Sequence, residues 1–320
     1  MLRYHFSGNL LQPEQLHPDA VFDKERRLAK EFVMDYPAGS RIDPCPVSGN
    51  QREEILFSKW GQQYAICPET WTLSLAALPH SEVLYQYFHG SSLAQYRASQ
   101  EYQHMASRLR QELWQSEWDW HESKIYQYLG KASVSLAEWG AKFAGMIEML
   151  RAARNIHTLG VIEPLPPLSE QNADGSFDVI CLYDAFQREI LPAKLLQRIQ
   201  SKLNSGGLLF IACRCGSGFD ILTLREHSDS IFPFDHVCLP SPKAIEGLMI
   251  QEGFDVLELT TPGLLDMPII SKGRIPRDHY FQRFLAQTLP EEQYGEFQQF
   301  LQKFLLSSHL RVVARKKGRE

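Results

Sequence analysis

Long apolar runs are missing from this chain of 320 residues. No stretch approaches the roughly 20 apolar residues that a membrane helix needs, and the first residues lack the apolar centre of a secretory signal. A surplus of basic residues is missing too, because 33 Lys and Arg stand against 38 Asp and Glu, for a net charge of −5. We therefore expect a cytoplasmic protein with no general affinity for membranes or nucleic acids.

Paired cysteines are also missing. The chain has six cysteines, and two of them open similar motifs, CPVS from Cys45 and CPET from Cys67, whose fourth position holds a hydroxyl residue. A structural zinc site uses four nitrogen or sulfur ligands, so we expect no bound zinc here. Cys213 and Cys215 are separated by one residue and could bind a metal, but no second pair of metal-ligand residues stands near them in the sequence. Separate thiols fit a reducing compartment.

Four regions differ in composition. Hydrophobic residues make up 44% and charged residues 22% of the chain, as in soluble globular proteins. The sequence predicts an N-terminal extension (1–43), a small loop-rich module (44–79), a helical segment (80–130) and a larger α/β domain (131–320).

An aromatic stripe marks the helical segment. Trp114, Trp118, His121, Ile125 and Tyr128 follow one another at spacings of three and four, which places them on one helical face. We expect this face to pack on the main domain, with His121 as an interface residue. A groove for a partner protein is the alternative.

Strand-like and helix-like segments alternate from about residue 132. This pattern indicates an α/β domain with a mainly parallel sheet covered on both faces, a Rossmann-type arrangement. The expected strands are 133–138, 156–163, 177–184, 208–213, 255–260 and 310–315, the expected helices are 141–154, 192–203 and 241–252, and two further helices separated by Pro290 precede the last strand.

The interval between the second and third strands is short. Only the thirteen residues Pro164–Ser176 separate Ile156–Glu163 from Phe177–Asp184, and three of them are prolines. A crossover that contains a helix needs at least about 10–12 residues before a further strand is added, and proline disrupts a helix interior. We therefore expect a sheet that is shortened at one edge.

The turn after the first strand reads Glu138-Trp-Gly140-Ala-Lys142-Phe-Ala-Gly. Sheets of this kind bind cofactors at the carboxyl ends of their first strands, where glycines let the backbone approach the ligand and an acid at the end of the second strand takes the ribose hydroxyls. Gly140 stands where the turn begins and Glu163 is placed for the ribose. Lys142, however, occupies the position of closest approach.

The segment FDVICLYDAFQREILPAKLLQRIQSKLNSGGLLFIACR (177–214) resembles the second half of class I S-adenosylmethionine (SAM)-dependent methyltransferases, as do parts of 219–266 and 306–316. The chain is similar to bacterial members with an N-terminal zinc-ribbon-like module, often acting in sugar or polysaccharide pathways. The resemblance covers 44–316 and is weak over 80–175. It implies a SAM site at Glu138, Gly140, Glu163 and Asp184, with His236 as candidate general base.

The chain departs from this family at functional places. Each Cys-x-x-Cys pair of the zinc-ribbon-like module keeps one thiol, and the Glu-His pair after the fourth strand corresponds to Gln187-Arg188. The glycine turn after the first strand keeps only Gly140 of its expected glycines. The family's second helix and third strand have no counterpart in the short interval before Phe177. These losses favour a degenerate methyltransferase, a pseudoenzyme that binds a protein partner such as an active methyltransferase paralogue or a pathway enzyme.

Two alternatives remain open. The first is a working SAM-dependent methyltransferase that acts on a sugar or another small metabolite. In the second, Lys142 holds a phosphate or carboxylate at the start of the following helix.

Overall fold

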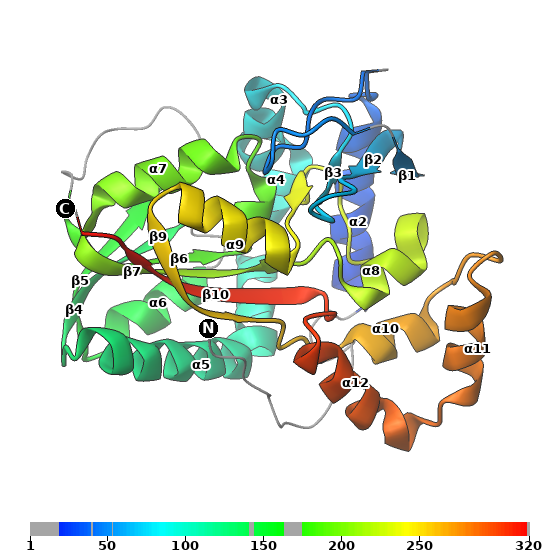
Figure 1. Ribbon diagram of the computed structural model, residues 1–320. Helices are drawn as coiled ribbons and strands as arrows, with labels where there is room; N and C mark the ends of the chain where they lie inside the picture. The colour runs from blue at the N-terminus through cyan, green and yellow to red at the C-terminus, as the bar shows by residue number, and fades with distance from the viewer. Residues whose placement is uncertain (1–18, 40, 53, 141–143, 163–174, 319–320) are drawn as a thin grey trace.

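Two sheets organise the computed structural model, which describes residues 19–39, 41–52, 54–140, 144–162 and 175–318 (Figure 1). The larger sheet has six strands in the order β5-β4-β6-β7-β10-β9, and the smaller has four in the order β1-β2-β3-β8. The strands of the larger sheet are β4 (Val134–Trp139), β5 (Ile156–Ile162), β6 (Phe177–Tyr183), β7 (Leu203–Arg214), β9 (Phe254–Thr260) and β10 (His309–Lys316).

The larger sheet is mainly parallel, as the sequence predicted. Strands β5, β4, β6 and β7 pair in parallel, with Glu138 of β4 opposite Val161 of β5 and Cys181 of β6. Strand β10 is antiparallel to both of its neighbours, β7 and β9. The chain passes from β4 to its neighbour β5 on one side and then returns to β6 on the other side of β4. The end of β4 is therefore the topological switch point of the sheet.

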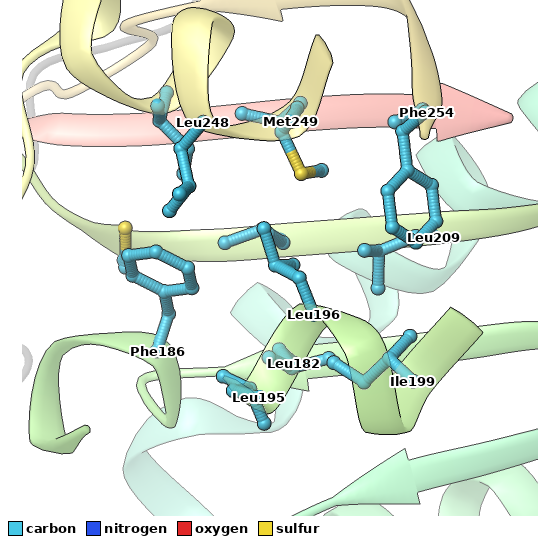
Figure 2. Close-up of a cluster of buried hydrophobic side chains, with 14 of the residues drawn as sticks. Leu182, Phe186, Leu195, Leu196, Ile199, Leu209, Leu248, Met249 and Phe254 are labelled. Carbon is cyan, nitrogen blue, oxygen red and sulfur yellow. The ribbon is translucent and has the colours of Figure 1, made fainter. Parts of the chain in front are cut away.

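Helices cover both faces of this sheet (Figure 1). One face carries α7 (Pro192–Lys202) and α9 (Pro242–Gln251), and the other carries α5 (Gln100–Leu129) and α6 (Ala144–Ala152). Figure 2 shows the core on the first face, where Leu196 and Ile199 of α7 approach Leu209 of β7 beneath Met249 of α9. The two-faced α/β fold that the alternating pattern indicated is confirmed.

The aromatic stripe of α5 packs on the second face. Trp114, Trp118, His121 and Ile125 are buried there, and the ring centre of His121 lies 4.4 Å from that of Phe210 in β7. The packing interpretation of the stripe is confirmed, and the alternative of an exposed partner groove is wrong.

The sheet ends at β5 in the described part of the chain, in agreement with the prediction of a sheet shortened at one edge. Among the described residues no strand lies beyond β5. Residues 163–174, and with them Glu163, lie outside the described part of the chain. One predicted boundary is wrong: the strand expected at 208–213 is β7, which begins at Leu203 and accommodates a left-handed Gly206 (φ +72°) within its length.

The smaller sheet joins the N-terminal module to the α/β region. Its strands are β1 (Ile55–Lys59), β2 (Gln62–Ile66), β3 (Leu73–Leu75) and β8 (Cys238–Leu239). Strand β8 belongs to the loop that follows β7, and it pairs with β3. The module is therefore built into the main body through a strand that the sequence did not reveal.

The remaining helices surround the carboxyl end of the sheet. No helix in the described ranges combines the length and apolar character required to cross a bilayer. A third C-terminal helix, α10, precedes the two that were predicted. The helices that surround the carboxyl end of the sheet are α2 (Asp19–Met34), α3 (Ser81–Tyr85), the π-helix η1 (Gln86–Gly90), α4 (Ser92–Ala98), α8 (Phe219–Leu224), α10 (Asp266–Lys272), α11 (Tyr280–Thr288) and α12 (Tyr294–Lys303).

A buried arginine holds the N-terminal module together. The guanidinium of Arg52 donates to the carbonyl oxygen of Asp43 (2.8 and 2.6 Å), to Ser74 Oγ (2.5 Å) and to the carbonyl oxygens of Leu75 and Ala76 (3.2 Å each). These bonds join the chain before β1 to β3. A buried acceptor that loses its donor carries its full desolvation cost.

We expect Arg52→Leu to lower the free energy of unfolding by about 3 kcal/mol, because several buried acceptors lose their donors together. The matched control is Arg41→Leu, since the Arg41 side chain is 82% exposed although it pairs with Asp43. Its expected cost is below about 0.5 kcal/mol. Urea denaturation measures both, and equal losses would contradict the role assigned to Arg52.

Candidate functional site

The candidate site lies where the carboxyl ends of β4, β5, β6 and β7 meet. Open α/β sheets bind ligands at this edge, beside the topological switch point. Glu138 is buried at the next-to-last position of β4, and Asp184 directly follows β6. The sequence prediction thus places these two acids at neighbouring strand ends.

Gly140 begins the turn after β4. Its φ is +104°, a conformation that favours glycine. Its N–H donates to the carbonyl oxygen of Ile162 in β5 (3.0 Å). A Cβ at this position would lie 3.1 Å from the Cβ of Ala185, in the turn after β6. The two turns that would flank a cofactor are therefore in close contact with each other.

Helix α5 reaches the N-terminus of α6, where Ala144 itself is exposed. The N–H of Ala144 donates to Gln103 Oε1 of α5 (3.1 Å). A Cβ at Gly145 would lie 2.3 Å from Ser107 Oγ and 2.9 Å from the ring of Trp114, so α5 approaches this turn too closely for any larger residue. Amides at a helix N-terminus are the groups that bind an anionic ligand. Here the first described amide of the helix already has a partner from the same chain.

Residues 141–143, including Lys142, lie outside the described part of the chain. Trp139, immediately before the turn, is fully buried on the face that carries α7. The guanidinium carbon of Arg198 in α7 lies 4.9 Å from the centre of its ring. This tryptophan therefore fills core space below the strand end.

Asp184 adopts a left-handed conformation (φ +52°) at the end of β6. Its N–H donates to the carbonyl oxygen of Ala212 in β7 (2.8 Å), which extends the pairing of the two strands by one residue. Aspartate tolerates this conformation better than most residues. The turn into Ala185 and Phe186, both buried, follows from it.

His236 lies in the loop between α8 and β8. Its Nδ1 accepts a hydrogen bond from the N–H of Phe232 (2.9 Å), and its carbonyl oxygen accepts one from Tyr64 of β2 (2.8 Å). Burial, together with the smaller effect of the Arg214 charge, lowers the pKa of His236 to about 3. The imidazole is therefore neutral and weakly basic at neutral pH.

A buried ionic cluster next to His236 escaped the sequence analysis. Arg97 of α4 binds Asp235 through two hydrogen bonds (3.0 and 2.7 Å) and Glu25 of α2 through a third (2.8 Å). Tyr87 donates to the same Asp235 carboxylate (2.8 Å). The members come from three separate parts of the sequence, around Glu25, Tyr87–Arg97 and Asp235, so no spacing signals them. They tie the loop before β8 to the N-terminal helices.

The two Cys motifs meet in the structure. Ser48 Oγ lies 3.6 Å from Cys67 Sγ, and both Cys45 and Cys67 are buried free thiols. Within the described ranges no three His, Cys, Asp or Glu side chains are placed to hold a metal ion. Two thiols with two hydroxyls do not fit the donor set of a structural zinc site.

A pair of buried carboxyls lies beyond the end of β7. Asp220 of α8 faces Asp266 of α10, whose oxygens accept from Ser307 Oγ (2.5 Å) and the N–H of Ser308 (2.9 Å). Burial and the charge of Asp266 raise the pKa of Asp220 to about 7, although Arg214 opposes this shift.

Replacement of His236 should alter the pH dependence of stability. Because its folded pKa lies below the ordinary 6.5, the unfolded chain takes up a proton first, and the free energy of unfolding falls as the pH drops from about 6.5 toward 3. His236→Asn keeps an acceptor for Phe232 but cannot titrate. Urea titrations at pH 7 and pH 5 should show a smaller loss for the variant, and an equal loss would contradict the burial assigned to His236.

Asp220→Asn should change the free energy of unfolding mainly at neutral and alkaline pH. The folded protein keeps the Asp220 proton longer than the unfolded chain, so the free energy of unfolding falls as the pH rises from the ordinary carboxyl value of 3.8 to about 7. The variant should be more stable than the parent at pH 8, by about 1–3 kcal/mol, with a smaller gain at pH 5. A loss of stability at pH 8 would overturn this assignment.

Comparison with known proteins agrees with this architecture. Residues 130–259 match the family model of a methyltransferase domain. No protein with a curated description matches the chain.

Three solved structures are similar in part. A proposed sarcosine dimethylglycine methyltransferase from Galdieria sulphuraria is 16% identical, with a TM-score of 0.42 over 65% of this chain and 88% of the other. Geranyl diphosphate C-methyltransferase from Streptomyces coelicolor is 11% identical, with a TM-score of 0.42 over 68% and 86%. Phosphoethanolamine N-methyltransferase 2 from Haemonchus contortus, bound to S-adenosylhomocysteine, is 14% identical, with a TM-score of 0.36 over 62% and 53%.

The strand order, with an antiparallel strand inserted beside the last parallel one, and the matched domain model lead to the same assignment. The sheet around residues 130–259, the part that matches the methyltransferase domain model, has the class I methyltransferase-like, Rossmann-type fold.

Proposed function

We propose that this chain is a degenerate class I methyltransferase that no longer holds SAM and serves as a binding or structural partner of another protein. The observation that carries the proposal is the contact that α5 makes with the first described residues of α6. Gln103 occupies the amide of Ala144, and α5 touches Gly145 too closely for a ligand to pass between them.

The turn after β4 supports the same conclusion. Gly140 donates its N–H to β5 and approaches Ala185 so closely that the two turns leave no gap at that point. Methyl transfer depends mainly on holding the sulfonium methyl in line with the nucleophile. A cofactor that cannot enter between these turns cannot be held in that way.

The candidate base supports it as well. A general base works best when its pKa lies near the operating pH. The pKa of His236 is lowered to about 3 by burial, and its Nδ1 is occupied by the N–H of Phe232. In this proposal His236 stabilises its loop.

The N-terminal module fits descent from a zinc-ribbon-containing methyltransferase of the sugar or polysaccharide type. Its two motifs still converge, but Ser48 and Thr70 replace the second thiol of each pair. The buried Arg52 and the pairing of β3 with β8 supply cohesion that a metal would otherwise provide. We propose a cytoplasmic protein whose partner is an active methyltransferase paralogue or a pathway enzyme.

The second candidate is an active SAM-dependent methyltransferase that acts on a sugar or another small metabolite. Glu138, Gly140 and Asp184 favour it, since all three stand at the expected strand ends. The first two would meet the methionine part of SAM, and Glu163 would hold the ribose. A phosphate or carboxylate ligand at Lys142 is the third candidate.

Isothermal titration with SAM and with S-adenosylhomocysteine separates these candidates. For the purified chain we expect no heat and no shift in melting temperature at millimolar ligand, because the turns after β4 and β6 are in contact and Gln103 already bonds the amide of Ala144. An active class I methyltransferase titrated in the same buffer is the positive control.

Micromolar binding of either ligand would sink the proposal if Glu163→Ala abolishes it. Binding of inorganic phosphate that Lys142→Ala removes would favour the third candidate instead. Neither ligand class should bind if the chain is only a partner.

A further inference from the structure

The segment between β9 and β10 forms a projecting unit of three helices, α10, α11 and α12 (Figure 1). Helix α10 packs against α8, and Met267 and Ile270 of α10 form a small core with Leu224 and Tyr294. Helix α11 lies at the outer end of this unit and contains no buried residue. Its hydrophobic side chains therefore have little cover within the chain.

Large apolar side chains are concentrated on this unit. Six of them are exposed by 39–78%: Tyr280, Phe281 and Phe284 on α11, Phe300 on α12, and Phe304 and Leu306 just after it. Since an aromatic side chain offers roughly 150–250 Å², the set exposes on the order of 700 Å² per copy. Buried together in one interface, this area would approach the roughly 800 Å² that each partner contributes to a stable interface.

The aromatic side chains of α12 form a continuous row. The ring centres of Phe297 and Phe300 are 5.9 Å apart, and those of Phe300 and Phe304 are 4.8 Å apart. Phe297 also contacts Phe219 of α8 (5.4 Å), which anchors the row to the body. Phe300 and Phe304 are therefore the exposed end of a row whose inner member contacts the body.

Charge is divided between the two helices. The approach to α11 carries three exposed basic residues, Lys272, Arg274 and Arg277, with Asp278 as the exception. The start of α12 carries three exposed acidic residues, Glu291, Glu292 and Glu296, with Lys303 at its far end. One unit thus offers an aromatic and basic surface and an aromatic and acidic surface side by side.

We propose that this chain forms a two-fold symmetric homodimer in which α11 of each copy packs on α12 of the other. A two-fold axis repeats each contact, so the basic end of α11 meets the acidic end of α12 twice. A second copy is the occupant that supplies both complementary charges and both apolar faces. This assembly does not depend on whether the chain binds SAM.

The test uses two charge-reversed variants of the full chain. The first, Arg274→Glu with Arg277→Glu, makes both surfaces acidic. The second, Glu292→Arg with Glu296→Arg, makes both basic. Like charges then face each other in either homodimer, whereas a mixed dimer brings acid to base at both contacts. Sedimentation velocity at low salt measures the outcome, with Lys30→Glu and Lys194→Glu on the exposed faces of α2 and α7 as the matched control.

The parent and the control should sediment as dimers. Each reversed variant alone should dissociate at least tenfold more readily, and an equimolar mixture should regain the dimer. Phe281→Glu should weaken the dimer in every combination. A parent that stays monomeric at high micromolar concentration, homodimers that ignore the reversals, or a mixture that stays monomeric would overturn the proposal. So would a monomer that instead sediments with anionic lipid vesicles.

Discussion

The docking of α5 on the sheet is the contact on which the rest of this structure depends. This helix of 30 residues crosses the sheet from α6 to the far edge. Lys124 pairs with the buried Glu258 of β9 (2.8 Å), and Glu117 pairs with Arg311 of β10. A buried ion pair gives little net stability, but removal of one partner is costly, so such pairs fix the position of the helix more than they strengthen it.

This position has a consequence at the carboxyl edge. With α5 fixed at β9 and β10, its first half lies over α6, where Gln103 bonds to Ala144 and Ser107 approaches Gly145. The same edge is tied from the other side by Arg97 and Asp235. Packing and buried ion pairs therefore occupy an edge that in an open α/β sheet receives ligands.

The fold was predictable because strands and helices alternate in hydrophobic pattern. Phe177–Tyr183 and Pro192–Lys202 could be assigned almost to the residue, since a continuous apolar run and a proline at the first helical position are strong local signals. Strand β8 was missed because two residues carry no periodicity. Helix α10 was missed because Pro268 stands in its first turn, where proline is tolerated but reads as a breaker.

The site was predictable only in part. Residue type and strand position predicted Glu138, Gly140 and Asp184 at the carboxyl ends of β4 and β6, where the structure has them. Their role in binding SAM stays a prediction. The bond from Gln103 to Ala144 joins residues 41 positions apart, and the cluster of Arg97 with Asp235 spans 138 positions. Contacts of this kind follow from how the elements dock. Neither composition nor spacing carries information about them.

The most direct test of this account is hydrogen–deuterium exchange of the segment from β4 through α6, with and without saturating S-adenosylhomocysteine. The amides of Gly140 and Ala144 are already bonded to Ile162 and Gln103, so the account predicts the same exchange in both samples. Slower exchange at these amides in the presence of the ligand would show that the turn opens to receive a cofactor, and would contradict it.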